Sequence, residues 1–157
     1  MSYPGKDMHR VRAFSFLFVL LTAPFCLARD LAVVVNKSNP TTSVTTAELE
    51  KLLKAATPNW PDGRKVRVFM TDPASSENRM ILPRAYGKMT AAEIKSFAEA
   101  HKPDIQIVSS DEIVLTMVDN NPGAIGVVNV YSINSQVKVL KVDDKLPMEQ
   151  GYLLHGN

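Results

Sequence analysis

Short polar and charged side chains follow an apolar stretch near the middle of the chain, and their types suit the binding of an oxyanion. Residues 66–70, Val-Arg-Val-Phe-Met, predict a buried strand, and the polar residues come directly after it. The first turn of a helix leaves backbone N–H groups without partners and carries partial positive charge. A helix that starts here would therefore offer hydroxyl and N–H donors to an anion such as phosphate. The predicted ligand-binding residues are Thr71, Asp72, Ser75, Ser76 and Arg79.

The same stretch also fits an ordinary helix start, in which no ligand is bound. Asp72 suits the N-cap position and Pro73 the first helical position, so the Asp72 carboxylate would itself fill the anion site. In either case we expect a helix from about Asp72 or Ser75, and Pro83 should kink or shorten it by removing one hydrogen bond. These residues alone leave the ligand site and the simple cap as alternatives.

Catalytic and metal-binding patterns are missing from the sequence after residue 28. Its two histidines are His101, expected at the end of a helix, and His155, expected in a mobile tail. Neither belongs to a metal-spaced cluster such as His-Glu-x-x-His, and Ser75 lacks the glycine-flanked turn of serine hydrolases. No glycine-rich phosphate loop ends in Lys-Ser or Lys-Thr. We therefore predict a non-enzymatic protein without a cofactor or a metal, and hydrolysis of phosphate esters is the least supported alternative.

The first 28 residues have the pattern of an export signal. Three basic residues precede an apolar run at residues 16–21, and Cys26-Leu27-Ala28 fits the small-x-small pattern of a signal-peptidase site. We predict cleavage after Ala28 and a periplasmic location. The apolar run is shorter than the roughly 20 residues that a membrane-spanning helix needs, which makes a retained anchor the weaker alternative. Translation starts at Met1 or at Met8, the latter giving a shorter basic segment.

Charge and composition limit the partners of residues 29–157. The chain has 18 basic and 16 acidic residues, of which the first 28 residues hold three and one, so residues 29–157 carry 15 of each and no net charge. This balance gives no support to a nucleic-acid-binding surface. Cys26 is the only cysteine, which excludes disulfides and thiolate catalysis after cleavage. The length suits a single domain with a substantial core.

Apolar runs and helix-capping patterns alternate along residues 29–157. Three capping boxes, each a Ser or Thr with Glu three residues later, predict helices that start near Thr45, Thr90 and Ser109. Ile113 is expected on the buried face of the third helix. This alternation predicts an α/β three-layer sandwich with a mostly parallel or mixed sheet of about five strands, and ligands of such folds bind at the carboxyl ends of the strands. The expected strands cover residues 31–35, 66–70, 105–108, 124–128 and 137–142.

Several stretches together resemble a known family, the phosphate-binding receptors of ABC uptake systems within the type II periplasmic binding proteins. The resemblance covers roughly residues 31–140, and the order and spacing of its motifs make it fairly specific for the fold. Trp60 is expected to plug the core, with ligand stacking as the alternative. The stretches that carry the resemblance are Val-Asn-Lys-Ser-Asn-Pro at 35–40, the helix at 45–53, Trp-Pro-Asp-Gly at 60–63, the strand and turn at 66–79 and Pro-Gly-Ala-Ile-Gly-Val-Val at 122–128.

The resemblance implies one lobe of a periplasmic solute-binding protein that binds phosphate or another small oxyanion for ABC-type uptake or sensing. Two departures from the family bear on this function. Met70 replaces the Arg that typically ends the strand, and Glu77 adds negative charge to the turn, although Arg79 lies close in sequence. The chain is also short enough to be a single lobe, so a small anion would stay largely in water, where each charge interaction is weaker.

Two kinds of partner follow from these departures. A single lobe that binds an oxyanion needs a second wall, from a homodimer, an ABC permease or a sensor protein. The alternative is a module that has kept the fold without a ligand and that contacts a sensor kinase, a porin or a transporter component. In both cases the predicted organisation is a signal peptide at residues 1–28 and one α/β domain at residues 29–157.

Overall fold

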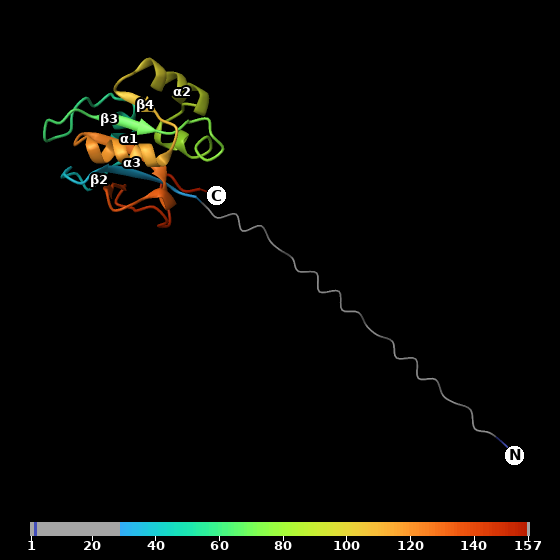
Figure 1. The fold of residues 1–157 in the computed structure, drawn as a ribbon. Helices are drawn as coiled ribbons and strands as arrows, with labels where there is room; N and C mark the ends of the chain where they lie inside the picture. The colour runs from blue at the N-terminus through green and yellow to red at the C-terminus, as the bar shows by residue number, and fades with distance from the viewer. Residues whose placement is uncertain (1, 3–28, 157) are drawn as a thin grey trace.

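The computed structural model describes residues 2 and 29–156, so the predicted signal peptide falls almost entirely outside the described residues. Residues 29–156 contain a five-stranded sheet in the order β4-β3-β5-β1-β6. Figure 1 shows β3 beside β4 in this sheet. A separate two-stranded parallel sheet is formed by β2 (Ser43–Val44) and β7 (Lys141–Val142). The strands of the main sheet are β1 (Leu31–Asn36), β3 (Arg67–Met70), β4 (Ile105–Ile107), β5 (Ala124–Asn129) and β6 (Val137–Val139).

The main sheet is mixed, with two parallel and two antiparallel pairings. β3 runs parallel to β4 and to β5, whereas β1 runs antiparallel to β5 and to β6. The register pairs Leu31 with Asn129 and Met70 with Val127. β3, β4 and β5 therefore end, and β1 begins, along one edge of the sheet, which we call the carboxyl edge. The opposite edge, where β3, β4 and β5 begin, is the amino edge.

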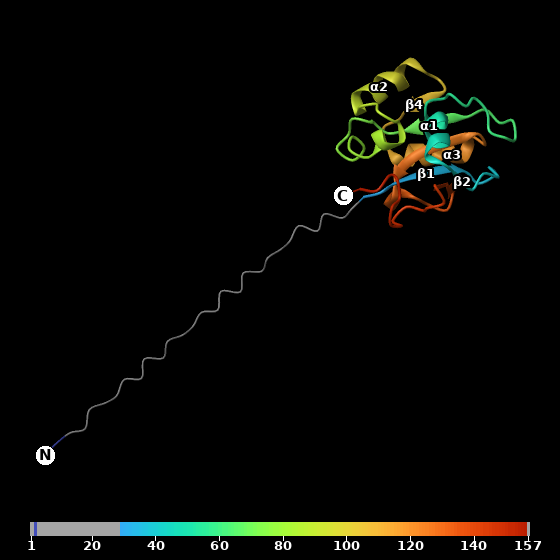
Figure 2. The ribbon, with the colours of Figure 1, turned by 180° about the vertical axis from the view of Figure 1, so that it is seen from behind.

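Helices cover both faces of the sheet, which confirms the predicted α/β sandwich. α3 (Asp111–Asn120) packs on one face (Figure 1), and α1 (Thr46–Leu53) and α2 (Ala91–Ala100) belong to the core on the other (Figure 2). None of the helices in residues 29–156 is long and apolar enough to cross a membrane. All residues of β1 and β5 are buried, because both strands are central and covered on both faces.

Thr45 begins α1 and Thr90 begins α2 through the same arrangement of hydrogen bonds. Each threonine hydroxyl accepts from the backbone N–H of the glutamate three residues later, and that glutamate's carboxylate accepts from the threonine N–H. At the start of α1 the two distances are 3.2 and 2.7 Å. Both predicted helix starts are confirmed.

The third helix begins one residue later than the sequence indicates. Ser110, and not Ser109, is the N-cap of α3, and its hydroxyl accepts from Ile113 N–H at 3.3 Å. α3 packs on the sheet through Val114, Leu115 and Val118. The side chain of Ile113 is consequently 40% exposed, so the prediction that it faces the core is wrong.

The chain after β3 does not form the α-helix that we predicted from Asp72 or Ser75. Residues 71–81 form a series of turns that lead into a short 3-10 helix, η1 (Leu82–Ala85). Pro83 is the second residue of η1. The N–H group of a residue in the first turn has no partner within the helix, so the lack of this group in proline costs nothing there. Residues 71–81 therefore offer no α-helix N-terminus to an anion.

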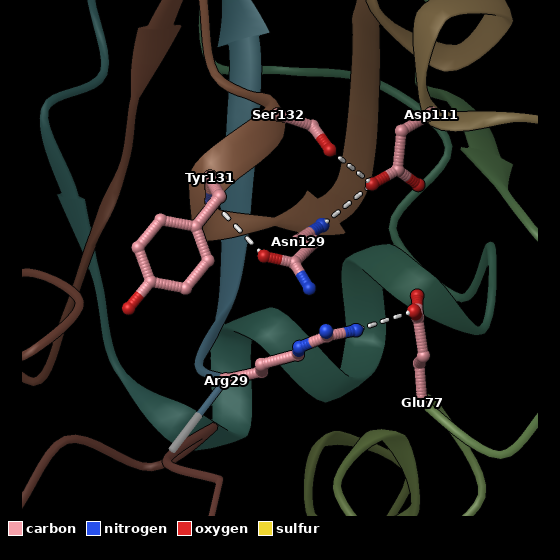
Figure 3. Close-up of a pocket in the computed structure, with 6 residues that line it drawn as sticks. All are labelled: Arg29, Glu77, Asp111, Asn129, Tyr131 and Ser132. Atoms are coloured by element: carbon pink, nitrogen blue, oxygen red, sulfur yellow. Dashed lines mark hydrogen bonds and ion pairs between the residues drawn. The ribbon is translucent and has the colours of Figure 1, made fainter. Parts of the chain in front are cut away.

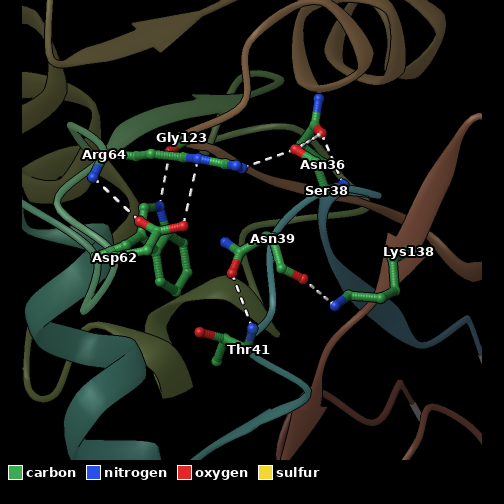
Figure 4. Close-up of polar contacts among 9 residues, drawn as sticks. Asn36, Ser38, Asn39, Thr41, Asp62, Arg64, Gly123 and Lys138 are labelled. Atoms are coloured by element: carbon green, nitrogen blue, oxygen red, sulfur yellow. Dashed lines mark hydrogen bonds and ion pairs between the residues drawn. The ribbon is translucent and has the colours of Figure 1, made fainter.

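Residues that carry the family resemblance form polar contacts at the amino edge (Figure 4). The Asn36 amide donates to the carbonyl oxygens of Val118 and Asp119 near the end of α3, at 2.9 and 2.8 Å. The Trp60 side chain is 4% exposed, and its indole donates to Gly123 O at 2.9 Å. Asn36 therefore caps a helix, and the prediction that Trp60 plugs the core is confirmed.

The C-terminal segment packs against the start of β1, which corrects the expectation of a mobile tail around His155. Tyr152 and Leu154 are buried, and Leu31 N–H donates to Leu154 O at 3.0 Å. His155 Nδ1 lies 2.7 Å from Oδ1 of Asp30, whose side chain is buried. The end of the described chain therefore lies beside the start of β1, at the carboxyl edge (Figures 1 and 2).

Candidate functional site

Polar side chains from four segments of the chain meet at the carboxyl edge. They come from the residues before β1, the turn after β3, the start of α3 and the turn after β5, and they line a pocket of about 390 Å³ that we call the first pocket (Figure 3). This location follows the rule that ligands of open α/β sheets bind outside the carboxyl ends of the strands. The lining residues are Arg29, Glu77, Asp111, Asn129, Tyr131 and Ser132.

The Asp111 carboxylate lies on one wall of the first pocket and accepts two hydrogen bonds there. Its Oδ2 accepts from Asn129 N–H at 2.9 Å and from the Ser132 hydroxyl at 2.7 Å (Figure 3). Asn129 Oδ1 in turn accepts from Tyr131 N–H at 3.0 Å, which fixes the turn after β5. Because a carboxylate already takes these donors, this wall repels an oxyanion.

A second pocket of about 390 Å³ adjoins the first and carries more positive charge. The two pockets share Arg29 and Glu77, which form an ion pair with Nη1 and Oε1 2.9 Å apart. Arg84 reaches the second pocket from η1, and its Nη1 donates to His155 O at 2.5 Å. Two guanidinium groups and one carboxylate therefore line this pocket. Its lining residues are Arg29, Ser76, Glu77, Met80, Ile81, Arg84 and Gly156.

Three of the predicted ligand-binding residues, Thr71, Asp72 and Ser75, are bonded within the turn after β3. The Asn78 amide donates to Thr71 Oγ1 at 2.9 Å, and Asn78 N–H donates to Ser75 Oγ at 3.2 Å. Asp72 Oδ1 accepts from Ala74 N–H at 2.9 Å. Such contacts between short polar side chains and nearby backbone stabilise turns. Neither pocket is lined by any of the three, and their role in ligand binding stays a prediction.

Ser76 and Arg79 are the other two predicted residues, and only Ser76 lines the second pocket, beside Arg29. Within residues 29–156, the N–H groups of Ser76 and Glu77 donate to no backbone carbonyl oxygen. The Arg79 side chain is exposed, and Arg79 N–H donates to Ser75 O at 3.0 Å. The structure thus brings one of the five predicted residues together with the cations of a pocket.

Asp72 forms an exposed ion pair with Lys95 on α2, with Oδ2 and Nζ 3.0 Å apart. The hydrogen bond from Ala74 N–H, and then the Lys95 ammonium group, hold the pKa of Asp72 below its ordinary value of 3.8. The folded state therefore favours the carboxylate. The resulting stabilisation is present above the ordinary pKa and is lost as the pH falls through the lower, folded-state pKa.

We expect Asp72→Asn to lower the free energy of unfolding at neutral pH by less than about 1 kcal/mol, since water screens an exposed pair. Urea denaturation of both proteins, in steps from neutral pH down to about pH 2, measures the difference. The two stabilities should converge at the acid end of the series. A difference that stays constant over the whole range would show that the ionised carboxylate is not its source.

Arg29 and Arg84 are candidate residues that no local sequence pattern indicates. Arg29 is the first residue after the predicted cleavage site, and Arg84 lies in a stretch without a motif. Each reaches the second pocket only through the fold, because 48 residues separate Arg29 from Glu77 and 71 separate Arg84 from His155. Their grouping is a property of the tertiary structure.

A third pocket of about 410 Å³ lies between α1, β2 and the loop around Trp60. It is lined by apolar side chains such as Val44 and Leu52, and its two charged groups are Glu48 and Lys51. The α1 capping box already holds the Glu48 carboxylate. In residues 29–156, no group of three His, Cys, Asp or Glu residues is placed to hold a metal ion. The carboxyl edge is therefore the better candidate site.

Solved structures of phosphate receptors share this fold. An ABC-type phosphate transport receptor from Vibrio cholerae is similar over 82% of this chain and 54% of its own, with a TM-score of 0.69 and 23% identity. PstS from Borrelia burgdorferi is similar over 83% of this chain and 55% of its own, with a TM-score of 0.67 and 20% identity. A phosphate binding protein from Stenotrophomonas maltophilia is similar over 76% of this chain and 40% of its own, with a TM-score of 0.60 and 12% identity.

These likenesses confirm the predicted resemblance at the level of the fold. The chain spans about half the length of the solved structures that it matches. No protein-family profile matches the chain, and no curated protein matches its sequence. The neighbours are named as receptors and binding proteins, and not as enzymes. The fold of this chain is thus that of phosphate receptors, and its ligand has to be argued from its own residues.

Proposed function

We propose that this protein is an exported, non-enzymatic solute-binding module that binds phosphate or another small oxyanion in the second pocket. The observation that carries the proposal is the set of residues that line this pocket: Arg29 and Arg84 carry guanidinium groups, Ser76 carries a hydroxyl, and the N–H groups of Ser76 and Glu77 donate to no backbone carbonyl oxygen of the described residues. Charged and backbone N–H donors form strong hydrogen bonds with phosphate oxygens. The fold shared with proteins named as phosphate receptors supports the same class of ligand.

Arg29 supplies the cation that the end of β3 lacks. Met70, the last residue of β3, is 1% exposed and has no charge to offer a ligand. Arg29 approaches the turn after β3 from the start of β1 and pairs there with Glu77. Arg29 donates to Glu77 through Nη1, and its other N–H groups can donate to an anion in the second pocket, whose charge then competes with that of Glu77 for the guanidinium. This competition should make binding by a single copy of the chain weak.

The proposed location rests on the N-terminal segment, and the proposed role rests on the fold that the chain shares with phosphate receptors. We place the protein in the periplasm, with residues 1–28 as a signal peptide that is cleaved after Ala28. There it would serve ABC-type uptake or the sensing of an oxyanion. The chain spans about half the length of the receptors that it matches. We propose a permease, a sensor protein or a second copy as the partner that faces the pocket.

Isothermal titration of the purified protein with phosphate, and then with sulfate at the same ionic strength, tests the proposal. Phosphate should give saturable heat. Arg29→Gln should weaken binding about tenfold or more, since a hydrogen bond to a charged group contributes about 1.5–3 kcal/mol. Glu77→Gln should strengthen binding, because it removes the carboxylate that competes for Arg29.

Glu99→Gln is the matched control for Glu77→Gln. Glu99 is 50% exposed and pairs with Lys102 near the end of α2, whereas Glu77 is 48% exposed. The control should leave the affinity for phosphate unchanged. If neither the natural protein nor Glu77→Gln gives heat at about 1 mM phosphate, the proposal fails.

An interaction module without a ligand is the second candidate function, and one observation favours it. In both pockets at the carboxyl edge, a carboxylate of the protein already accepts hydrogen bonds from the lining residues. It is Asp111 in the first pocket and Glu77, paired with Arg29, in the second. Such a module would contact a sensor kinase, a porin or a transporter component through the carboxyl edge. A partner protein that binds equally well with and without phosphate would favour this function.

A further inference from the structure

Five large apolar side chains are exposed in residues 29–156, at Met80, Ile113, Tyr131, Leu146 and Met148. Three of them are placed at the carboxyl edge. Met80, 73% exposed, lines the second pocket, and Tyr131, 59% exposed, lines the first. Met148 is 67% exposed, and its N–H donates to Oδ2 of Asp30, the residue that precedes β1. We call Met80, Tyr131 and Met148 the apolar rim.

The apolar rim borders polar groups. Arg29 lines both pockets, and Met80 and Tyr131 each line one of them. Ile113 is not part of the rim, because it lies two positions after Asp111 on α3 and such positions do not face each other. Exposed apolar patches that are rimmed by polar residues mark protein–protein interaction sites.

We propose that the apolar rim docks a second copy of this chain, carboxyl edge against carboxyl edge, and that the contact encloses the oxyanion pocket. The claim that the contact encloses an oxyanion pocket rests on the proposed function. The claim that two copies dock rests only on the exposed side chains. Residues 29–157 carry 15 basic and 15 acidic residues. Two copies therefore carry no net charge that would keep them apart, and no strongly acidic or basic partner is favoured.

The charges at the edge are also complementary to themselves. Arg29 and Glu77 form an ion pair within one copy and are both about half exposed, at 55% and 48%. In a two-fold symmetric contact, each residue pair across the interface is made twice. Arg29 of each copy can thus pair with Glu77 of the other, so the two internal ion pairs are exchanged for two external ones.

A second copy would change the surroundings of a bound anion. In one copy, the charges of Arg29 and Arg84 act partly through water, where the attraction between unit charges is weak. A facing protein wall displaces this water and strengthens the attraction. Phosphate binding and dimerisation should therefore favour each other, because a ligand that binds the dimer more tightly shifts the equilibrium toward it.

Sedimentation equilibrium of the purified protein, first without and then with phosphate, tests the inference. We expect a monomer–dimer equilibrium that phosphate shifts toward the dimer. Met80→Glu and Tyr131→Glu place a charge at rim positions that are 73% and 59% exposed, so the fold should persist while the dimer weakens about tenfold or more. Ala100→Glu is the control, since it adds the same charge at an exposed position at the end of α2, away from the apolar rim.

The outcomes separate this inference from the proposed function. A monomer at every protein concentration up to about 1 mM, or a dimer that both rim variants leave unchanged, overturns the inference even if phosphate binds. Phosphate that binds without any effect on the equilibrium would place the pocket outside the contact and also overturn it. A dimer that the rim variants weaken and phosphate strengthens supports it. If the rim variants weaken a dimer but titration detects no binding of phosphate, the contact between two copies is supported and the proposed function fails.

Discussion

Asp30→Ala should lower the free energy of unfolding by about 3–5 kcal/mol, because it removes a buried carboxylate that joins the two ends of the described chain. The Asp30 side chain is 2% exposed. Its Oδ1 accepts from Gly156 N–H at 3.1 Å and lies 2.7 Å from His155 Nδ1, and its Oδ2 accepts from Met148 N–H at 2.6 Å. The variant leaves these groups without an acceptor in a place that water does not reach easily.

Urea denaturation, followed by the fluorescence of the single tryptophan, measures this loss. Glu99→Gln, at an exposed carboxylate, is the control and should change the stability by no more than about 0.5 kcal/mol. Asp30→Asn keeps one acceptor and nearly the same volume, so its loss should lie between the two. A loss of less than about 1 kcal/mol for Asp30→Ala would show that these contacts do not hold the ends together.

The same contacts position the proposed anion site. Asp30 follows Arg29 directly, and His155, which contacts Asp30, accepts from Arg84 Nη1 through its carbonyl oxygen. Both guanidinium groups of the second pocket are therefore placed by the packing of the C-terminal segment against the start of β1. The site depends on contacts between the ends of the domain, and a variant that loosens them should weaken phosphate binding as well as stability.

Local sequence patterns predicted the features that local interactions decide. The capping boxes at Thr45 and Thr90 are confirmed because the hydroxyl, the glutamate and the first helical turn lie within four residues. At α3 the sequence offers two adjacent serines as caps. The structure uses Ser110, which places Asp111 at the first position of the helix, where it accepts from Asn129 N–H. That contact spans 18 residues, so the helix start depends on tertiary structure and not on the capping pattern alone.

Strand directions were not readable from the residues. An apolar run that is buried on both faces marks a central strand but does not give its direction. β1 and β5 both have this pattern, and in the structure they are antiparallel over five register pairs. The sandwich and the approximate number of strands could be predicted, whereas the direction of β1 required the structure.

The candidate site was predicted less well than the fold, since its charged groups come from distant parts of the chain. Ser76 was identified from the turn after β3, but 48 residues separate Arg29 from Glu77. The turn itself also differs from the helix that the Asp-Pro pattern favoured. Asn78 donates to Thr71 and to Ser75, and these bonds hold the chain in a series of turns. The sequence thus indicated the edge of the sheet where the candidate pockets lie, but it proposed Arg79 as the cation and gave no sign of Arg29 and Arg84.

Gly123→Ala should destabilise the protein by about 3–5 kcal/mol, since the backbone of a neighbouring segment fills the space that a Cβ needs. A Cβ at this position would lie 2.0 Å from Lys65 O. The carbonyl oxygen of Gly123 also accepts from the Trp60 indole at 2.9 Å and from Arg67 N–H at 3.2 Å. Any shift that relieves the clash therefore strains the bonds that hold Trp60 over the core and β3 beside β5.

Gly63→Ala is the matched control for this prediction. Gly63 has a φ of +89°, and a Cβ there would meet nothing within 4 Å, so only the strain of the left-handed backbone applies, about 1–2 kcal/mol. Urea denaturation of both variants should show the larger loss in the free energy of unfolding for Gly123→Ala. Equal losses would mean that the backbone at Lys65 can move away from the added Cβ at little cost. Because Gly123 lies at the amino edge, the folded fraction of this variant should still bind phosphate with unchanged affinity. That result would separate the scaffold from the site at the carboxyl edge.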